Sequence, residues 1–369
     1  MKKILKTNKI NLFYDPINTN SSKEFFQIDL KKNKSIRKIL IIKWSAMGDI
    51  IIASGVINDI LSHFDNHIVD LNTLPLYQKL FQQDKRIHAV WGNNFLSGYK
   101  KILSSIKWMK HVYKNNYDLI IDLQTNDRSR ILLSFLKIFN LLPNYTIGNH
   151  DIFPYSISSK RKRKIYNPLF LMQSTLSTIG IKPKTVQPTV YISKISYNKI
   201  KLILRKNNLK IKKFIVFIPG SSSSNKLKRW GYKNFSNLFD LINKNNKKVL
   251  LVGGPEDINE CNKIKKLSPK IINLCNKVEI EDLIALFDFA EFVISNDTGP
   301  CHLTACTRTK VIQITGPTDP QKVKPIGKNI ISIQPELPCV NCYQKYCSHH
   351  SCMKNVHPEY IYNLISKNK

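Results

Sequence analysis

The chain has 369 residues, and its 58 Lys and Arg outnumber its 25 Asp and Glu, for a formal net charge of +33. The length exceeds what one ordinary core needs and predicts two domains. An apolar content of 42% argues against a disordered chain, and no apolar run has the length of a membrane span. The charge attracts phosphorylated substrates, anionic lipid or nucleic acid, although runs of Asn, Ile and Lys equally indicate compositional bias.

Residues 1–35 are polar and irregular, and we expect an N-terminal extension. Lys6, Asn8 and Lys9 interrupt the first apolar residues, so we expect no export signal and a cytoplasmic location. From Lys38 onward, short β-branched runs alternate with amphipathic runs, which is typical of a parallel sheet covered by helices. In this first domain, 36–182, we expect strands at 39–42, 68–71, 88–91 and 119–122 and helices at 49–61, 97–114 and 127–138.

Residues 183–211 begin with a Pro-containing stretch and are expected to be a linker region. The alternation then restarts and predicts a second domain over 212–369. Its expected strands are 214–218, 249–252, 271–274, 292–294 and 311–314, with helices near 232–243, 256–266, 279–288 and 353–365. The fold class that this pattern favours is α/β, with two doubly wound, Rossmann-like domains facing a cleft. In such sheets ligands bind at the carboxyl ends of the strands.

The first strand leads into a turn where Gly48 permits a tight bend and Asp49 stands at the start of a helix. A carboxylate at this position either caps the helix or acts as a general base that faces the cleft. The turn by itself does not decide between these two roles.

In the second domain, a small, polar loop follows the strand 214–218 and ends in Lys228 and Arg229. Backbone N–H groups, the hydroxyl of Ser221 and the Lys charge suit a phosphate, although a flexible surface loop has the same composition. After the next strand, Gly253 and Gly254 allow close approach of a ligand, and Glu256 or Asp257 either accepts from ribose hydroxyls or begins a helix.

The stretch 295–302 follows another apolar strand and includes Asp297, Thr298, Gly299 and His302. A strand that turns on Gly into a helix leaves free N–H groups at the helix start, which favour a phosphate or carboxylate. A similar turn, 315–320, ends the following strand. Several such turns at strand ends of one domain predict a site for an anionic, nucleotide-linked substrate.

From about Lys38 to the C-terminus, the chain resembles the heptosyltransferases of glycosyltransferase family nine. The order and spacing of several short segments carry this resemblance. These segments are 45–49, 122–124 with Asn126 and Arg128-Ser129, 228–230, 253–256, 297–299 with His302, and 316–319. One departure is Gly231, where many members of the family have Pro.

The resemblance implies a GT-B fold and an inverting transfer, without an essential metal, from a nucleotide sugar, typically ADP-heptose. It implies that Asp49 is the base that deprotonates the acceptor and that Lys228 neutralises the leaving diphosphate. It implies a donor site in the second domain, at Ser221, Lys228, Arg229, Gly254, Glu256, Asp297, Thr298, Gly299 and His302. On the acceptor side it implies Ser45, Gly48, Gln124, Asn126 and Arg128.

Near the C-terminus, within 339–352, four cysteines have the spacing C-x2-C-x4-C-x4-C. They are Cys339, Cys342, Cys347 and Cys352. In a cytosolic chain such a cluster favours a metal site over disulfides, with structural zinc as the first expectation and an iron–sulfur cluster or a redox-labile pair as alternatives.

The favoured function is transfer of a sugar to a lipopolysaccharide-core or related surface-glycan acceptor, an acidic, lipid-linked glycan at the cytoplasmic face of the inner membrane. One alternative is the same fold with another nucleotide sugar and acceptor. Another alternative is a basic nucleic-acid-binding protein with a zinc module. The sequence argues against it, because no basic motif with interleaved aromatic residues stands out.

Overall fold

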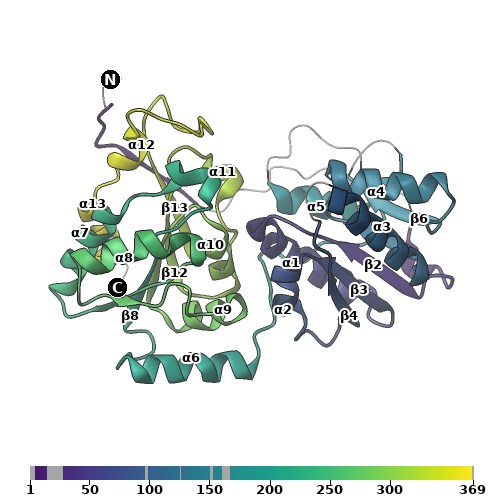
Figure 1. Cartoon of the computed structure of the whole chain (residues 1–369), viewed down its shortest axis with the longest axis horizontal. Coiled ribbons are helices and arrows are strands. Elements are labelled where there is room, and N and C mark those ends of the chain that lie inside the picture. The colour runs from purple at the N-terminus through teal and green to yellow at the C-terminus, as the bar shows by residue number, and fades with distance from the viewer. Residues whose placement is uncertain are drawn as a thin grey trace. The chain divides into compact units, whose positions relative to one another are not determined.

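The structure is a computed structural model that describes residues 5–14, 28–95, 99–124, 126–149, 153–159 and 167–367. The chain divides into two compact units (Figure 1). Unit 1 contains Met1–Pro16 and Ile192–Lys369, and unit 2 contains Ile17–Tyr191. Each unit has its own sheet, so the expected α/β class with two doubly wound, Rossmann-like halves is confirmed.

The sheet of unit 2 has the strand order β4-β3-β2-β5-β6-β7, and all its pairings are parallel. Because the order reverses between β2 and β5, the carboxyl ends of these two strands form the switch point at which α/β sheets bind ligands. The strands are β2 (Lys38–Ile42), β3 (Ile68–Thr73), β4 (Ala89–Gly92), β5 (Leu119–Asp122), β6 (Tyr145–Gly148) and β7 (Ile157–Ser158).

Helices α3 and α4 pack on one face of this sheet, where apolar side chains of β2 and β5 meet Trp108, Leu132 and Leu136. Helix α1 packs against α5. The helices are η1 (Leu30–Lys32), α1 (Met47–His63), η2 (Pro75–Tyr77), α2 (Gln78–Phe81), α3 (Tyr99–Lys114), α4 (Asp127–Ile138) and α5 (Pro168–Ser177).

The sheet of unit 1 has the order β1-β13-β12-β11-β8-β9-β10, and its switch point lies between β8 and β11. All its pairings are parallel except that of β1 with β13. The strands are β1 (Ile10–Phe13), β8 (Phe214–Ile218), β9 (Lys248–Leu251), β10 (Ile272–Asn273), β11 (Phe292–Asn296), β12 (Lys310–Ile314) and β13 (Ile330–Pro335).

Helices α7, α8 and α13 cover one face of this sheet and share a core cluster with its strands. The helices of unit 1 are α6 (Lys194–Lys206), η3 (Ser223–Lys228), α7 (Tyr232–Asn243), η4 (Pro255–Asp257), α8 (Ile258–Leu267), α9 (Ile280–Phe289), α10 (Gly299–Leu303), η5 (Thr304–Cys306), α11 (Pro320–Val323), α12 (Ser351–Lys354) and α13 (Pro358–Lys367). None of the helices in the described part of the chain has both the length and the apolar character needed to cross a bilayer.

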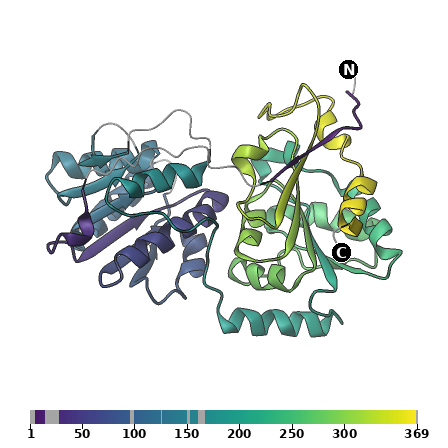
Figure 2. The same cartoon turned by 180° about the vertical axis from the view of Figure 1, so that it is seen from behind.

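Three local expectations differ from the structure. Residues 10–13, expected to be irregular, form β1, and Figure 2 shows this purple strand lying along the green sheet of unit 1. The expected linker contains α6, which packs against α9. The expected helix 353–365 is two helices, because Pro358 disfavours a helical conformation of the residue before it.

Asn72, at the carboxyl end of β3, is fully buried and organises the core beneath the switch point of unit 2. Its Oδ1 accepts from the indole N–H groups of Trp44 at 2.6 Å and Trp108 at 2.7 Å. Its Nδ2 donates to the carbonyl of Trp91 at 3.2 Å. One amide therefore satisfies two buried indoles, and its loss leaves both without an acceptor.

We predict that Asn72→Ala lowers the free energy of unfolding by about 3 kcal/mol, because two buried donors lose their partner. Urea titration followed by circular dichroism measures this loss. Asn94→Ala, at an exposed position of the same unit, is the matched control and should change stability little. Equal stability of both variants would contradict the role given to Asn72.

Candidate functional site

In unit 2, the turn between β2 and α1 is fastened by Gln124, which follows β5. Its Oε1 accepts from the backbone N–H of Trp44 at 3.0 Å and of Ser45 at 3.1 Å. Its own N–H donates to Asp122 at 2.9 Å, and Asp122 also accepts from the hydroxyl of Tyr155 at 2.6 Å. Gln124 and Ser45, both expected on the acceptor side, are therefore neighbours, and Gln124 holds the shape of the turn.

Asp49 lies in the first turn of α1, two residues beyond Met47 and directly after Gly48. One carboxylate oxygen accepts from the backbone N–H of Ala46 at 3.2 Å, so the capping role is present. The side chain is half-buried, and this hydrogen bond engages one of its two carboxylate oxygens. Capping and general base catalysis are compatible at this position.

The two remaining residues that were expected on the acceptor side differ in their surroundings. Asn126 is the N-cap of α4, and its Oδ1 accepts from Ser129 N–H at 3.0 Å. Arg128 is exposed, and its guanidinium lies 5.0 Å from the ring centre of Phe95. That ring packs on Trp44 with centroids 4.5 Å apart, which places Arg128 beside the turn that Gln124 holds.

In unit 1, Lys228 and Asp297 form an ion pair at the switch point, with 2.8 Å between the Lys Nζ and Asp Oδ2. The same carboxylate oxygen accepts from Thr318 Oγ at 2.8 Å. Asp297 is buried, whereas Lys228 is partly exposed. Three loops that follow β8, β11 and β12 thus meet at one carboxylate. Thr318 was not singled out from the sequence, although it lies within the matched segment 316–319.

Asn296, next to Asp297, links the loops that follow β8 and β11 at this switch point. It is fully buried, its Nδ2 donates to the carbonyl of Pro219 at 2.6 Å, and its Oδ1 accepts from Trp230 N–H at 3.1 Å. The sequence reasoning missed this residue because an Asn between Ser and Asp reads as part of the turn. Gly231 follows Trp230 with a φ of 100°, a value that Pro cannot adopt.

The guanidinium of Arg229 is engaged by other groups of the protein. Its guanidinium donates to Ser221 Oγ at 3.2 Å and to the Ser221 carbonyl at 2.9 Å, and it pairs with Asp257 at 3.1 Å. Burial raises the pKa of Asp257, and Arg229 acts in the opposite direction. A Cβ on Gly220 would lie 2.1 Å from the Asp257 carboxylate, so the glycine of this loop makes room for a side chain of the protein.

The other expected donor residues surround these loops. Thr298 and Gly299 open the short helix α10, and His302 on that helix is buried. Glu256 is exposed in η4, and Gly254 just before it has no heavy atom within 4 Å of an added Cβ. Unit 1 therefore brings the expected donor residues to the carboxyl ends of its central strands.

The cysteine segment supports two of these loops. The backbone N–H groups of Asn341 and Tyr343 donate to the carbonyls of Gly316 at 3.1 Å and Pro317 at 2.8 Å. His350 Nε2 donates to the carbonyl of Leu227 at 2.6 Å. The segment thus contacts the turns that carry both Thr318 and Lys228.

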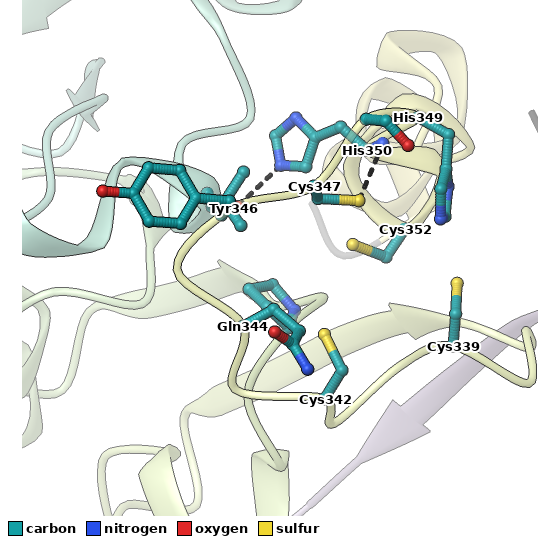
Figure 3. Close-up of a pocket in the computed structure, with 11 residues that line it drawn as sticks. Cys339, Cys342, Gln344, Tyr346, Cys347, His349, His350 and Cys352 are labelled. Carbon is teal, nitrogen blue, oxygen red and sulfur yellow. Dashed lines mark hydrogen bonds between the residues drawn. The ribbon is translucent and has the colours of Figure 1, made fainter. Parts of the chain in front are cut away.

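The four cysteines line one pocket of about 330 Å³ (Figure 3). Burial and the neighbouring thiols raise the pKa of Cys352 to about 12, and its Sγ packs against Gly316. Across the described ranges, no group of three or more His, Cys, Asp or Glu side chains is arranged to hold a metal. The expected zinc or iron–sulfur site at Cys339, Cys342, Cys347 and Cys352 is therefore not supported, because Cys352 belongs to the apolar core whereas Cys342 is exposed.

Residues 105–353 match the model of glycosyltransferase family 9 (heptosyltransferase). The chain belongs to glycosyltransferase family 9. It is 27% identical over 322 residues to lipooligosaccharide heptosyltransferase 2 of Campylobacter jejuni, which covers 85% of this chain and 93% of that protein. The expected family and the expectation of a glycosyltransferase are thereby confirmed.

Solved structures of family 9 share the fold. A family 9 glycosyltransferase from Veillonella parvula superposes with a TM-score of 0.78 at 15% identity, covering 90% of this chain and 96% of that one. Escherichia coli heptosyltransferase WaaC with ADP-2-deoxy-2-fluoro heptose gives a TM-score of 0.66 at 17% identity, covering 90% and 100%.

In this family 9 enzyme, we predict that Gly220→Ala lowers the free energy of unfolding by about 1–3 kcal/mol, because the new methyl group displaces Asp257 from Arg229. Thermal unfolding measures the change. Gly254→Ala is the matched control, since its φ of −86° suits Ala and its surroundings are open. A Gly220→Ala protein as stable as this control would contradict the packing argument.

Proposed function

We propose that this chain is an inverting heptosyltransferase that moves heptose from ADP-heptose to a lipopolysaccharide-core acceptor. The relatives named as heptosyltransferases and the ADP-heptose analogue in the E. coli structure support this donor and acceptor. The observation that carries the proposal is the Lys228–Asp297–Thr318 cluster at the switch point of unit 1. A cation fixed beside loop N–H groups suits the diphosphate of a nucleotide sugar.

Within this site, different residues bind different parts of the donor. Lys228 and the backbone N–H groups of Thr298 and Gly299 bind the diphosphate. Asp297 repels phosphate, so its carboxylate orients Lys228 and accepts hydrogen bonds from sugar hydroxyls. Glu256, exposed near Gly254, accepts from the ribose, and His302 supports the turn from α10. Arg229 and Ser221 hold the shape of the loop and do not contact the donor directly.

The transfer also needs a base, and the candidate for this role, Asp49, belongs to unit 2. The acceptor hydroxyl gives its proton to Asp49 while its oxygen bonds to the anomeric carbon opposite the diphosphate. The bond from that carbon to the diphosphate oxygen breaks, and ADP leaves with the bonding electrons. Lys228 stabilises the charge that develops on ADP, which is the role a metal ion plays in other transferases.

On the acceptor side, Arg128 and the turn held by Gln124 provide positive and polar groups for an acidic glycan. The net charge of +33 adds a long-range attraction for a phosphorylated, lipid-linked acceptor at the cytoplasmic face of the inner membrane. The alternative is transfer of a different sugar from another nucleotide. A screen of nucleotide-sugar donors distinguishes it from heptose transfer.

We predict that Asp49→Asn lowers kcat at least a hundredfold, because the amide cannot take a proton, and leaves ADP-heptose binding near wild type. Product formation measures the first effect and calorimetric titration of the donor the second. Lys228→Met is the contrasting variant and should weaken donor binding. A fully active Asp49→Asn enzyme would remove Asp49 from the role of base.

A further inference from the structure

Helix α4 presents large apolar side chains to solvent on the side that faces away from the sheet. Ile131, Phe135 and Ile138 are three or four residues apart, so they share one face of the helix. Their exposed fractions are 54%, 50% and 64%. The opposite face packs on the strands through Leu132 and Leu136. The exposed side chains are therefore not part of this core, and the transfer described above does not use them.

Helix α3 contacts α4 and shows the same division (Figure 1). Trp108 and Val112 belong to the core cluster on which α4 also packs. On the other side of α3, Ile102, Ile106 and Tyr113 are 64%, 50% and 52% exposed. We call these three side chains and the three of α4 the α3–α4 surface. Several large apolar side chains that gather on one side of a domain mark an interaction site.

Lysines border the apolar side chains of the α3–α4 surface. Lys107, Lys110 and Lys114 are exposed, and Lys110 stands between Ile106 and Tyr113 on one face of α3. The sequence of α3 contains no acidic residue, and that of α4 contains one, at its first position. Such a surface complements a bilayer with anionic headgroups, because the ammonium groups meet lipid phosphates while the apolar side chains enter the interface.

The same lysines argue against a second copy of this chain as the occupant. A symmetric dimer through the α3–α4 surface would place the lysines of one copy near those of the other, and like charges oppose that arrangement. An anionic bilayer satisfies both the apolar side chains and the charge.

The α3–α4 surface continues toward the residues that were expected on the acceptor side. Arg128 lies on the same face of α4, three residues before Ile131, and its guanidinium is 5.0 Å from the ring centre of Phe95. Phe95 packs on Trp44, in the turn that Gln124 holds. A bilayer in contact with this surface is therefore close to that turn.

We propose that the α3–α4 surface is a docking site for a bilayer that contains anionic phospholipid. The apolar side chains and the lysines carry the docking itself. Its consequence for the reaction rests on the proposed function, because a docked unit 2 meets a lipid-linked acceptor in the plane of the membrane. Docking then raises the effective concentration of that acceptor at the site.

The test is binding of the full chain to vesicles of phosphatidylethanolamine and phosphatidylglycerol, measured by co-sedimentation. Wild type should bind these vesicles and bind vesicles of phosphatidylcholine weakly. Phe135→Ser/Ile138→Ser should weaken binding at least about tenfold, because it removes apolar area from the interface. Lys107→Gln/Lys110→Gln/Lys114→Gln should also weaken it at least about tenfold, because each lysine near an anionic surface contributes to binding. Both variants change exposed positions and should fold as wild type does.

Helix α6 of unit 1 and the residues after it offer matched controls. Ile195→Ser/Leu202→Ser removes two exposed apolar side chains from another basic helix. Lys201→Gln/Lys206→Gln/Lys210→Gln removes the same charge as the lysine variant of α3, again at exposed positions. Both controls should bind vesicles as wild type does.

Three results would overturn the proposal. The first is a wild-type protein that does not bind the anionic vesicles. The second is an equal loss of binding in the α6 controls, which would mean a general attraction by the net charge. The third is a dimer in sedimentation velocity that Phe135→Ser/Ile138→Ser dissociates while vesicle binding is unchanged, which would assign the surface to a second copy.

A second readout separates this proposal from the proposed function. Heptose transfer to a deacylated, water-soluble core should be equal in wild type and in both variants of the α3–α4 surface. Transfer to the same core embedded in the vesicles should fall together with binding, and an unchanged rate there would overturn the role of docking in the reaction. Vesicle binding that depends on this surface, in a wild-type protein that transfers no heptose, would contradict the proposed function and support the docking site.

Discussion

The ion pair of Lys228 with the buried carboxylate of Asp297, at the switch point of a parallel sheet, is the interaction on which the proposed donor site depends. The Lys228 ammonium lies 2.8 Å from the Asp297 carboxylate in unit 1, and Lys43, which follows β2 in unit 2, is a second buried lysine at a switch point. Parallel strands bring their carboxyl ends to one edge, and there the chain concentrates groups that are expensive to bury alone. The two lysines differ in exposure: the Lys228 side chain is partly exposed, whereas Lys43 is buried.

Side-chain amides hold the loops that carry these charges. Asn296 joins Pro219 to Trp230 in unit 1, and Gln124 joins the turn before α1 to β5 in unit 2. Each amide uses both its donor and its acceptor or bonds two backbone groups, so each fixes a loop without adding charge. In the proposed function, preorganisation of this kind lets a small set of charged groups act on the diphosphate of the donor without rearrangement during the reaction.

Much of the strand and helix order could be predicted from the sequence, because short β-branched runs separated by amphipathic ones have few other interpretations. The turns at the strand ends, and with them Lys228 and Asp297, were accessible for the same reason. The edge strand β1 was not, since its partner β13 is more than 300 residues away. The close packing of Asp257 against Gly220 could not be predicted from the sequence, and the spacing of the cysteines did not indicate that Cys352 packs in the core.

The most direct test of this account is the reaction of the purified enzyme with a heptose-deficient lipopolysaccharide core and a panel of nucleotide sugars. ADP release and glycosylated product should appear together with ADP-heptose, and NMR of the product should show the anomeric configuration opposite to that of the donor. Turnover of a different nucleotide sugar with none of ADP-heptose, or a product that retains the configuration of the donor, would contradict it.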